Sequence, residues 1–147
     1  SFRENKGLVL SEGLLFSNNI IKSIEGCLFY SGVPVELSDM TFTANTNQES
    51  LGSIIQVSSS SVVLRNFNIE KNKASLAMIE GQNSSLTLNN LKCSQNVSDS
   101  SGCIAFSLKS AAVTLKVLDS HFIDNQGNNA AGALFFNNKA SELLIAN

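Results

Sequence analysis

A pair of positions recurs along the chain: an apolar residue followed three residues later by an asparagine. We call these asparagines the anchors, and the four clear ones are Asn45, Asn72, Asn96 and Asn125. Their spacings are 72 − 45 = 27, 96 − 72 = 24 and 125 − 96 = 29 residues. Self-similarity with a period of about 20 to 50 residues is typical of solenoids and other repeat folds. The segment Phe2-Arg3-Glu4-Asn5 is interpreted as a fifth copy in a less regular region.

Three further positions in each repeat are apolar. They lie ten residues before the anchor (Val35, Val62, Leu86, Leu115), eight before it (Leu37, Leu64, Leu88, Val117) and five before it (Met40, Phe67, Leu91, with Ser120 as the exception). The two-residue step between the first two positions predicts a strand with one buried face. The next apolar position comes three residues later instead of two, so the alternation of buried and exposed positions shifts by one residue at the same place in every repeat. This shift predicts a corner that leads into a second strand.

The corner has a polar signature of its own, six residues before the anchor. Asp39, Asn66, Asn90 and Asp119 stand there, and Asn147 has the same place in a truncated last repeat. Asparagine and aspartate tolerate left-handed backbone geometry and bond to nearby backbone groups. The sequence therefore predicts a corner column at these five residues.

After each anchor, a polar loop leads to a strand of small residues, such as Ala131-Gly132-Ala133-Leu134. We expect the variation in repeat length to lie mainly in this loop. Three short strands in a coil of about 27 residues predict an all-β fold, a right-handed single-stranded parallel β-helix (a pectate-lyase-like solenoid). Coils would stack about 4.8 Å apart. The anchors would then form a ladder of hydrogen-bonded amides. An antiparallel sandwich is the competing fold.

The prediction for domain organisation is a single β-helix domain or segment over residues 1–147. Residues 1–32 are expected to form irregular N-terminal coils, and residues 33–147 four regular coils plus a truncated one. A β-helix cut in this way exposes unpaired strand edges, which natural proteins cover or pair. We therefore expect continuation within a larger chain, or end-to-end self-association into a fibre.

Composition narrows the choice of partners. Ten basic residues balance 12 acidic ones without a basic cluster, which argues against nucleic acid as a partner. The apolar runs are too short for a membrane span. Three cysteines, Cys27, Cys93 and Cys103, match no common zinc spacing. They are interpreted as small buried hydrophobic residues, with one disulfide plus a leftover thiol as the alternative.

The paired motifs resemble those of the polymorphic outer-membrane protein repeat family, which read Gly-Gly-Ala-Ile and Phe-x-x-Asn. The best matches are Phe122 to Asn125 and Ala131 to Leu134, with weaker ones at Phe42 to Asn45 and Gly102 to Ile104. The resemblance covers roughly residues 33–147. It implies parallel β-helix passengers used for adhesion and surface display, hence an extracellular or cell-surface location and a glycan or cell-surface ligand.

Candidate chemistry is sparse in the sequence. Asp119, His121 and Asp124 form one local cluster, which we interpret as corner and loop residues rather than as a metal site. We assign no catalytic or cofactor-binding residue and no cofactor. The predicted function is therefore a non-catalytic structural or adhesive scaffold, and the alternative is a polysaccharide-binding or polysaccharide-cleaving enzyme. Two sequons make Asn83 and Asn96 candidates for N-glycosylation.

Overall fold

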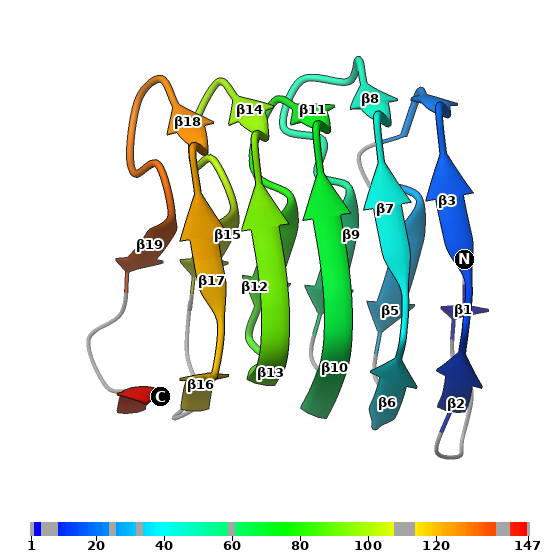
Figure 1. Ribbon diagram of the computed structural model, residues 1–147, viewed down its shortest axis with the longest axis vertical. Coiled ribbons are helices and arrows are strands. Elements are labelled where there is room, and N and C mark those ends of the chain that lie inside the picture. Colours follow the sequence, from blue (N-terminus) through cyan, green and yellow to red (C-terminus); the bar gives the residue numbers. More distant parts are fainter. Residues whose placement is uncertain are drawn as a thin grey trace.

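The computed structural model describes residues 2–3, 9–23, 26–31, 34–58, 61–107, 114–137 and 142–146. Every element in these ranges is a β-strand, and all named strands pair in parallel. Figure 1 shows the coils side by side, from the N-terminal coil in blue to the last strands in orange and red. The predicted all-β parallel solenoid is confirmed, and the antiparallel sandwich is wrong.

Three sheets form the walls of the solenoid (Figure 1). The front sheet contains β2 (Val9–Glu12), β3 (Leu15–Ser17), β6 (Val35–Ser38), β7 (Thr41–Thr43), β10 (Ser61–Glu70), β13 (Ser85–Ser94), β16 (Thr114–Leu118), β17 (His121–Ile123) and β20 (Glu142–Ala146). The narrow sheet contains β4 (Ile20–Ile21), β8 (Thr46–Asn47), β11 (Lys73–Ala74), β14 (Val97–Ser98) and β18 (Gln126–Gly127). The rear sheet contains β1 (Phe2–Arg3), β5 (Leu28–Ser31), β9 (Ile55–Ser58), β12 (Ile79–Gln82), β15 (Ile104–Ser107) and β19 (Leu134–Asn137).

The corner predicted from the shift in alternation lies within a single long strand in β10 and β13, and between two shorter strands in the other coils, such as β6 and β7. In β10, Val62 and Leu64 are buried before the corner, and Phe67 and Ile69 are buried after it. Arg65 and Asn66 between them are both exposed. Two consecutive outward residues exchange the buried parity, so that both halves of the strand turn their apolar side chains towards the same interior.

Like residues stack on like along the rod axis, and the core is built from these columns. Val62 pairs with Leu86 and Leu64 with Leu88 in the β10–β13 register, and all four are at most 1% exposed. The rings of Phe16 and Phe42 stack with centroids 4.7 Å apart, close to the spacing of adjacent strands. Burial of these continuous apolar columns is the main stabilising term for the fold.

The N-terminal region differs from the prediction. Phe2 and Arg3 pair with Tyr30 and Ser31 in the rear sheet, so they are not part of an anchor motif. The true first copy runs from Phe16 to Asn19, because Phe16 pairs with Phe42 of the next coil. Residues 9–23 and 26–31 thus belong to a coil in register, and the expectation of irregular coils is wrong for them. Residues 4–8, 24–25 and 32–33 lie outside the described residues.

Loop lengths also correct the prediction. The register aligns Ile55, Ile79, Ile104 and Leu134 at the start of the rear strands. The step from the anchor to this position ranges from 79 − 72 = 7 to 55 − 45 = 10 residues. The step from this position to the next front strand also varies, from 62 − 55 = 7 to 115 − 104 = 11 residues. Insertions are therefore accepted at both corners of the rear wall, since neither corner belongs to the ladder described below.

Candidate functional site

The anchors form one continuous ladder through the solenoid. Asn45, Asn72 and Asn96 are at most 1% exposed. The backbone N and Nδ2 of Asn45 both donate to Asn72 Oδ1 at 2.9 Å. Asn72 repeats these two bonds to Asn96 at 2.9 and 3.1 Å, and Asn96 repeats them to Asn125 at 3.1 and 2.9 Å. A fifth member missed by the sequence analysis, Asn19, donates in the same way to Asn45.

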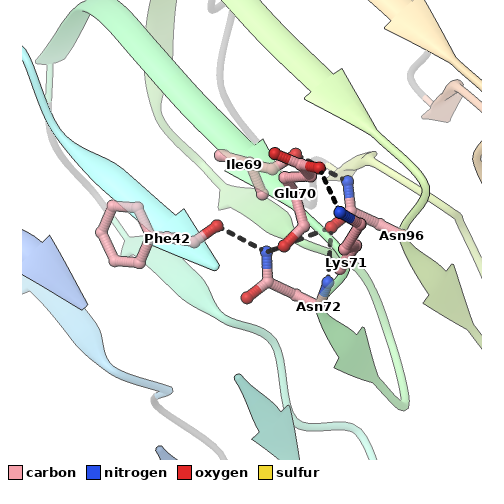
Figure 2. Close-up of polar contacts among 6 residues, drawn as sticks. All are labelled: Phe42, Ile69, Glu70, Lys71, Asn72 and Asn96. Carbon is pink, nitrogen blue, oxygen red and sulfur yellow. Dashed lines mark hydrogen bonds and ion pairs between the residues drawn. The ribbon is translucent and has the colours of Figure 1, made fainter. Parts of the chain in front are cut away.

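The ladder amides of Asn45, Asn72, Asn96 and Asn125 also reach back to the preceding coil. Asn72 Nδ2 donates to Phe42 O at 2.8 Å as well as forward to Asn96, as Figure 2 shows. Asn45, Asn96 and Asn125 make the equivalent backward bonds at 2.9, 2.9 and 2.7 Å. A carboxamide has two N–H donors and one carbonyl acceptor, so an interior anchor links three consecutive coils.

A left-handed residue precedes every ladder asparagine. Its φ lies between 51 and 56° at Asn18, Ala44, Lys71, Gln95 and Asp124. Sequence reasoning missed this second left-handed column, because alanine, lysine and glutamine carry no signal for such a conformation. Lys71 at this position is exposed and forms an ion pair with Glu70 at 2.8 Å (Figure 2). The hydrogen bond from Lys71 lowers the pKa of Glu70.

The predicted corner residues also line up. Asp39, Asn66, Asn90 and Asp119 have φ between 48 and 55°. Asn66 Nδ2 donates to Asp39 Oδ1, and Asn90 Nδ2 donates to Asn66 Oδ1, both at 2.9 Å. The hydrogen bond from Asn66 lowers the pKa of the Asp39 carboxyl, with a smaller contribution from Ser38. Asn147 lies outside the described residues.

The two aspartates of the corner column are not neighbours. Asp39 and Asp119 stand in one column with Asn66 and Asn90 between them. The side chains of Asp119, His121 and Asp124 are all exposed. Within the described residues, no three histidine, cysteine, aspartate or glutamate side chains are placed to hold a metal ion.

One buried carboxylate was missed by the sequence analysis. Glu80 in β12 is 4% exposed. Ser53 Oγ donates to it at 3.2 Å, Gln56 Nε2 donates at 2.9 Å, and Gln82 Nε2 donates as well. Three donors satisfy a carboxylate in the rear wall, and they connect adjacent coils as the anchors do. A single acidic residue among apolar ones gave no repeat signal by which to find this network.

Two of the cysteines form a disulfide, so the alternative interpretation is the correct one. Cys93 of β13 is bonded to Cys103, just before β15, and both residues are fully buried. The bond crosses the interior from the front sheet to the rear wall within one coil. Cys27 is a free, half-buried thiol, and burial raises its pKa to about 11.

The two sequons have different surroundings. Asn96 is fully buried, and its Nδ2 donates to Ile69 O and to Asn125 Oδ1. An N-linked glycan would replace one of these protons, so glycosylation of Asn96 is incompatible with the folded ladder. Asn83 is half-buried, with φ of 49°, in the short connection between β12 and β13.

Comparison of the chain with protein-family models, curated protein sequences and solved structures finds no match to any of them. The resemblance to the polymorphic outer-membrane protein repeats therefore rests on the short motifs alone. Among the described residues, no helix is long and apolar enough to cross a membrane.

Proposed function

We propose that this chain is a non-catalytic scaffold with a structural or adhesive function. It would form a stiff segment of right-handed β-solenoid in a cell-surface or extracellular protein. The observation that supports this most directly is the five-membered asparagine ladder. Each interior amide connects three coils, so these side-chain hydrogen bonds run along the rod axis and hold successive coils together. Buried, fully paired polar networks rigidify the structure that contains them.

The disulfide supports the extracellular part of the proposal. Disulfides persist in oxidising compartments and are rare in the cytosol, where thiols are kept reduced. A buried bond between Cys93 and Cys103 fits a chain that matures in such a compartment. Surface display is also what the motif resemblance implies, and Asn83, in the connection between β12 and β13, stays a candidate for N-glycosylation.

The location can be tested on intact cells of the source organism. An antibody raised against the folded chain should label cells before permeabilisation, and external protease should remove the label. An antibody against a cytosolic protein serves as the control for membrane integrity. Labelling that requires permeabilisation would refute the surface location and leave the solenoid itself untouched.

The proposal includes continuation of the stacked coils, either within a larger chain or by end-to-end association with a second copy. The ladder is polar, because each anchor donates to the oxygen of the next one. The ladder therefore offers donors beyond Asn125 and an acceptor before Asn19, which either further coils of a larger chain or a second copy could pair. The last strand also exposes apolar side chains, among them Leu143 at 41% and Ile145 at 62%.

Sedimentation velocity over a range of protein concentrations tests this association. The wild type should form larger species as concentration rises, and Ile145→Asp should abolish them. Leu51→Asp is the matched control, because Leu51 is also exposed, at 70%, but lies in a loop away from the ends. A wild type that stays monomeric throughout, or equal behaviour of both variants, would overturn the association.

A further inference from the structure

Cys93 and Cys103 occupy two columns that face each other across the solenoid interior. The front column is set by the strand register and contains Phe16, Phe42, Ile69, Cys93 and Phe122. The rear column holds the residue before each rear strand start, namely Cys27, Ile54, Met78, Cys103 and Ala133. In the coil before the disulfide, the same two places are taken by Ile69 and Met78, which are larger than two cysteines.

In this coil the disulfide therefore connects the front and rear walls, whereas in the preceding coil larger side chains pack between the walls. Protein interiors are close-packed, and the two bonded sulfurs must separate to the contact distance of unbonded atoms when the bond between the two walls is reduced. Cys93 and Cys103 are both fully buried, so such movement would occur inside the core.

The disulfide also touches the ladder. Cys93 Sγ lies 3.3 Å from Asn96 Nδ2 and 3.8 Å from Asn125 Oδ1. In the disulfide this sulfur has no proton, whereas a free thiol is a weak donor. After reduction the new S–H would face Asn125 Oδ1, which already accepts two hydrogen bonds from Asn96. The state of the sulfur thus acts directly on the contact between Asn96 and Asn125.

We propose that the Cys93–Cys103 disulfide is a redox-sensitive brace, whose reduction by a small dithiol loosens the Asn96–Asn125 rung and the coils around it. Two electrons and two protons pass from the dithiol to the disulfide. The products are thiols at Cys93 and Cys103 and a disulfide in the reductant. The rungs from Asn19 to Asn72 stay closed, since they lie in coils packed by phenylalanine, isoleucine and methionine.

The remaining thiol of the chain does not interfere with this brace. The attacking species in disulfide exchange is a thiolate, and burial raises the pKa of Cys27 to about 11. Cys27 also stands three places from Cys103 in the rear column, roughly 14 Å at the strand spacing.

Hydrogen exchange measured by mass spectrometry on the whole chain tests the proposal, before and after treatment with dithiothreitol. Reduction should speed amide exchange in residues 91–98 and 121–127 by on the order of tenfold to a hundredfold. Exchange in residues 62–70 should not change. Reoxidation should restore the original pattern.

Three variants make the result specific. Cys93→Ile with Cys103→Met places the residues of the preceding coil in this one, and it should be protected with or without reductant. Cys93→Ala with Cys103→Ala should exchange like the reduced wild type, and Cys27→Ser should keep the full redox response. Equal exchange of the oxidised and reduced wild type, or free thiols at both positions in unreduced protein, would overturn the brace. A redox response in the Ile/Met variant would overturn it as well.

Discussion

The ladder makes a quantitative prediction at Asn72. Alanine at this position removes the acceptor for Asn45 N and Asn45 Nδ2 and the donor to Phe42 O. Asn96 Oδ1 keeps one partner, because it still accepts from the Asn72 backbone N. A buried polar group left without a partner costs about 1 to 3 kcal/mol. Asn45 Nδ2 keeps its bond to Phe16 O, so the two groups that lose their side-chain partner are Asn45 N and Phe42 O. We therefore expect Asn72→Ala to lower the free energy of unfolding by about 2 to 5 kcal/mol.

Asn125→Ala is the matched control for this prediction. It deletes the same kinds of bond, to Asn96 N, Asn96 Nδ2 and Cys93 O, but at a half-exposed position in the last anchored coil. Water can replace the lost partners there, so we expect about 1 kcal/mol. Urea denaturation followed by circular dichroism gives both values, and hydrogen exchange shows which coils open. Equal losses in the two variants, or a loss below about 1 kcal/mol for Asn72→Ala, would refute the ladder as an axial stabiliser.

Three further predictions concern the corners and the rear wall. Asn66 has φ of 54°, so Asn66→Val should lower the unfolding free energy by about 1 to 2 kcal/mol, whereas Asn66→Gly should stay within about 0.5 kcal/mol in the same denaturation assay. The hydrogen bond from Asn66 lowers the pKa of the Asp39 carboxyl below its ordinary value of 3.8. This pairing therefore stabilises the fold at pH values above 3.8, and its contribution is lost as the pH falls through the lower pKa of the folded state. In an NMR titration, Asn66→Gly should raise the Asp39 pKa towards 3.8. A Cβ on Gly81 would lie 2.4 Å from the Phe106 ring, so Gly81→Ala should cost about 1 to 3 kcal/mol in thermal unfolding, and adding Phe106→Leu should recover part of this loss.

The features that the sequence predicted correctly are those in which one residue type is required at one place in every coil. A ladder position requires a side chain that donates two hydrogen bonds and accepts others, as asparagine does. The ladder could therefore be predicted from the recurrence of asparagine at one place in each repeat. The corner at Asp39, Asn66, Asn90 and Asp119 was visible for a similar reason, because few residues accept left-handed geometry.

The features that the sequence analysis missed have no such chemical requirement, or were masked by a substitution. Ala44 and Lys71 adopt the left-handed conformation because the stacked coils impose it, not because their side chains favour it. The first coil was overlooked because Gly13 takes the place of the corner Asn or Asp and Ser11 takes an apolar place in the register with Leu37. Spacing along the chain also could not decide whether Cys93 and Cys103 meet, since they come from opposite walls of one coil.

One wall of the solenoid has a fixed length and the others do not. In the five coils whose front strand and anchor are both described, the step from the position in register with Val35 to the ladder asparagine is ten residues, since 19 − 9 = 45 − 35 = 72 − 62 = 96 − 86 = 125 − 115 = 10. One added residue there would turn the strand over and move the anchor out of the ladder. The other two corners differ between coils by several residues, because no stacked amide fixes them. The rod can therefore accept new loops on two sides while its axis stays intact, a property that the proposed scaffold function would use.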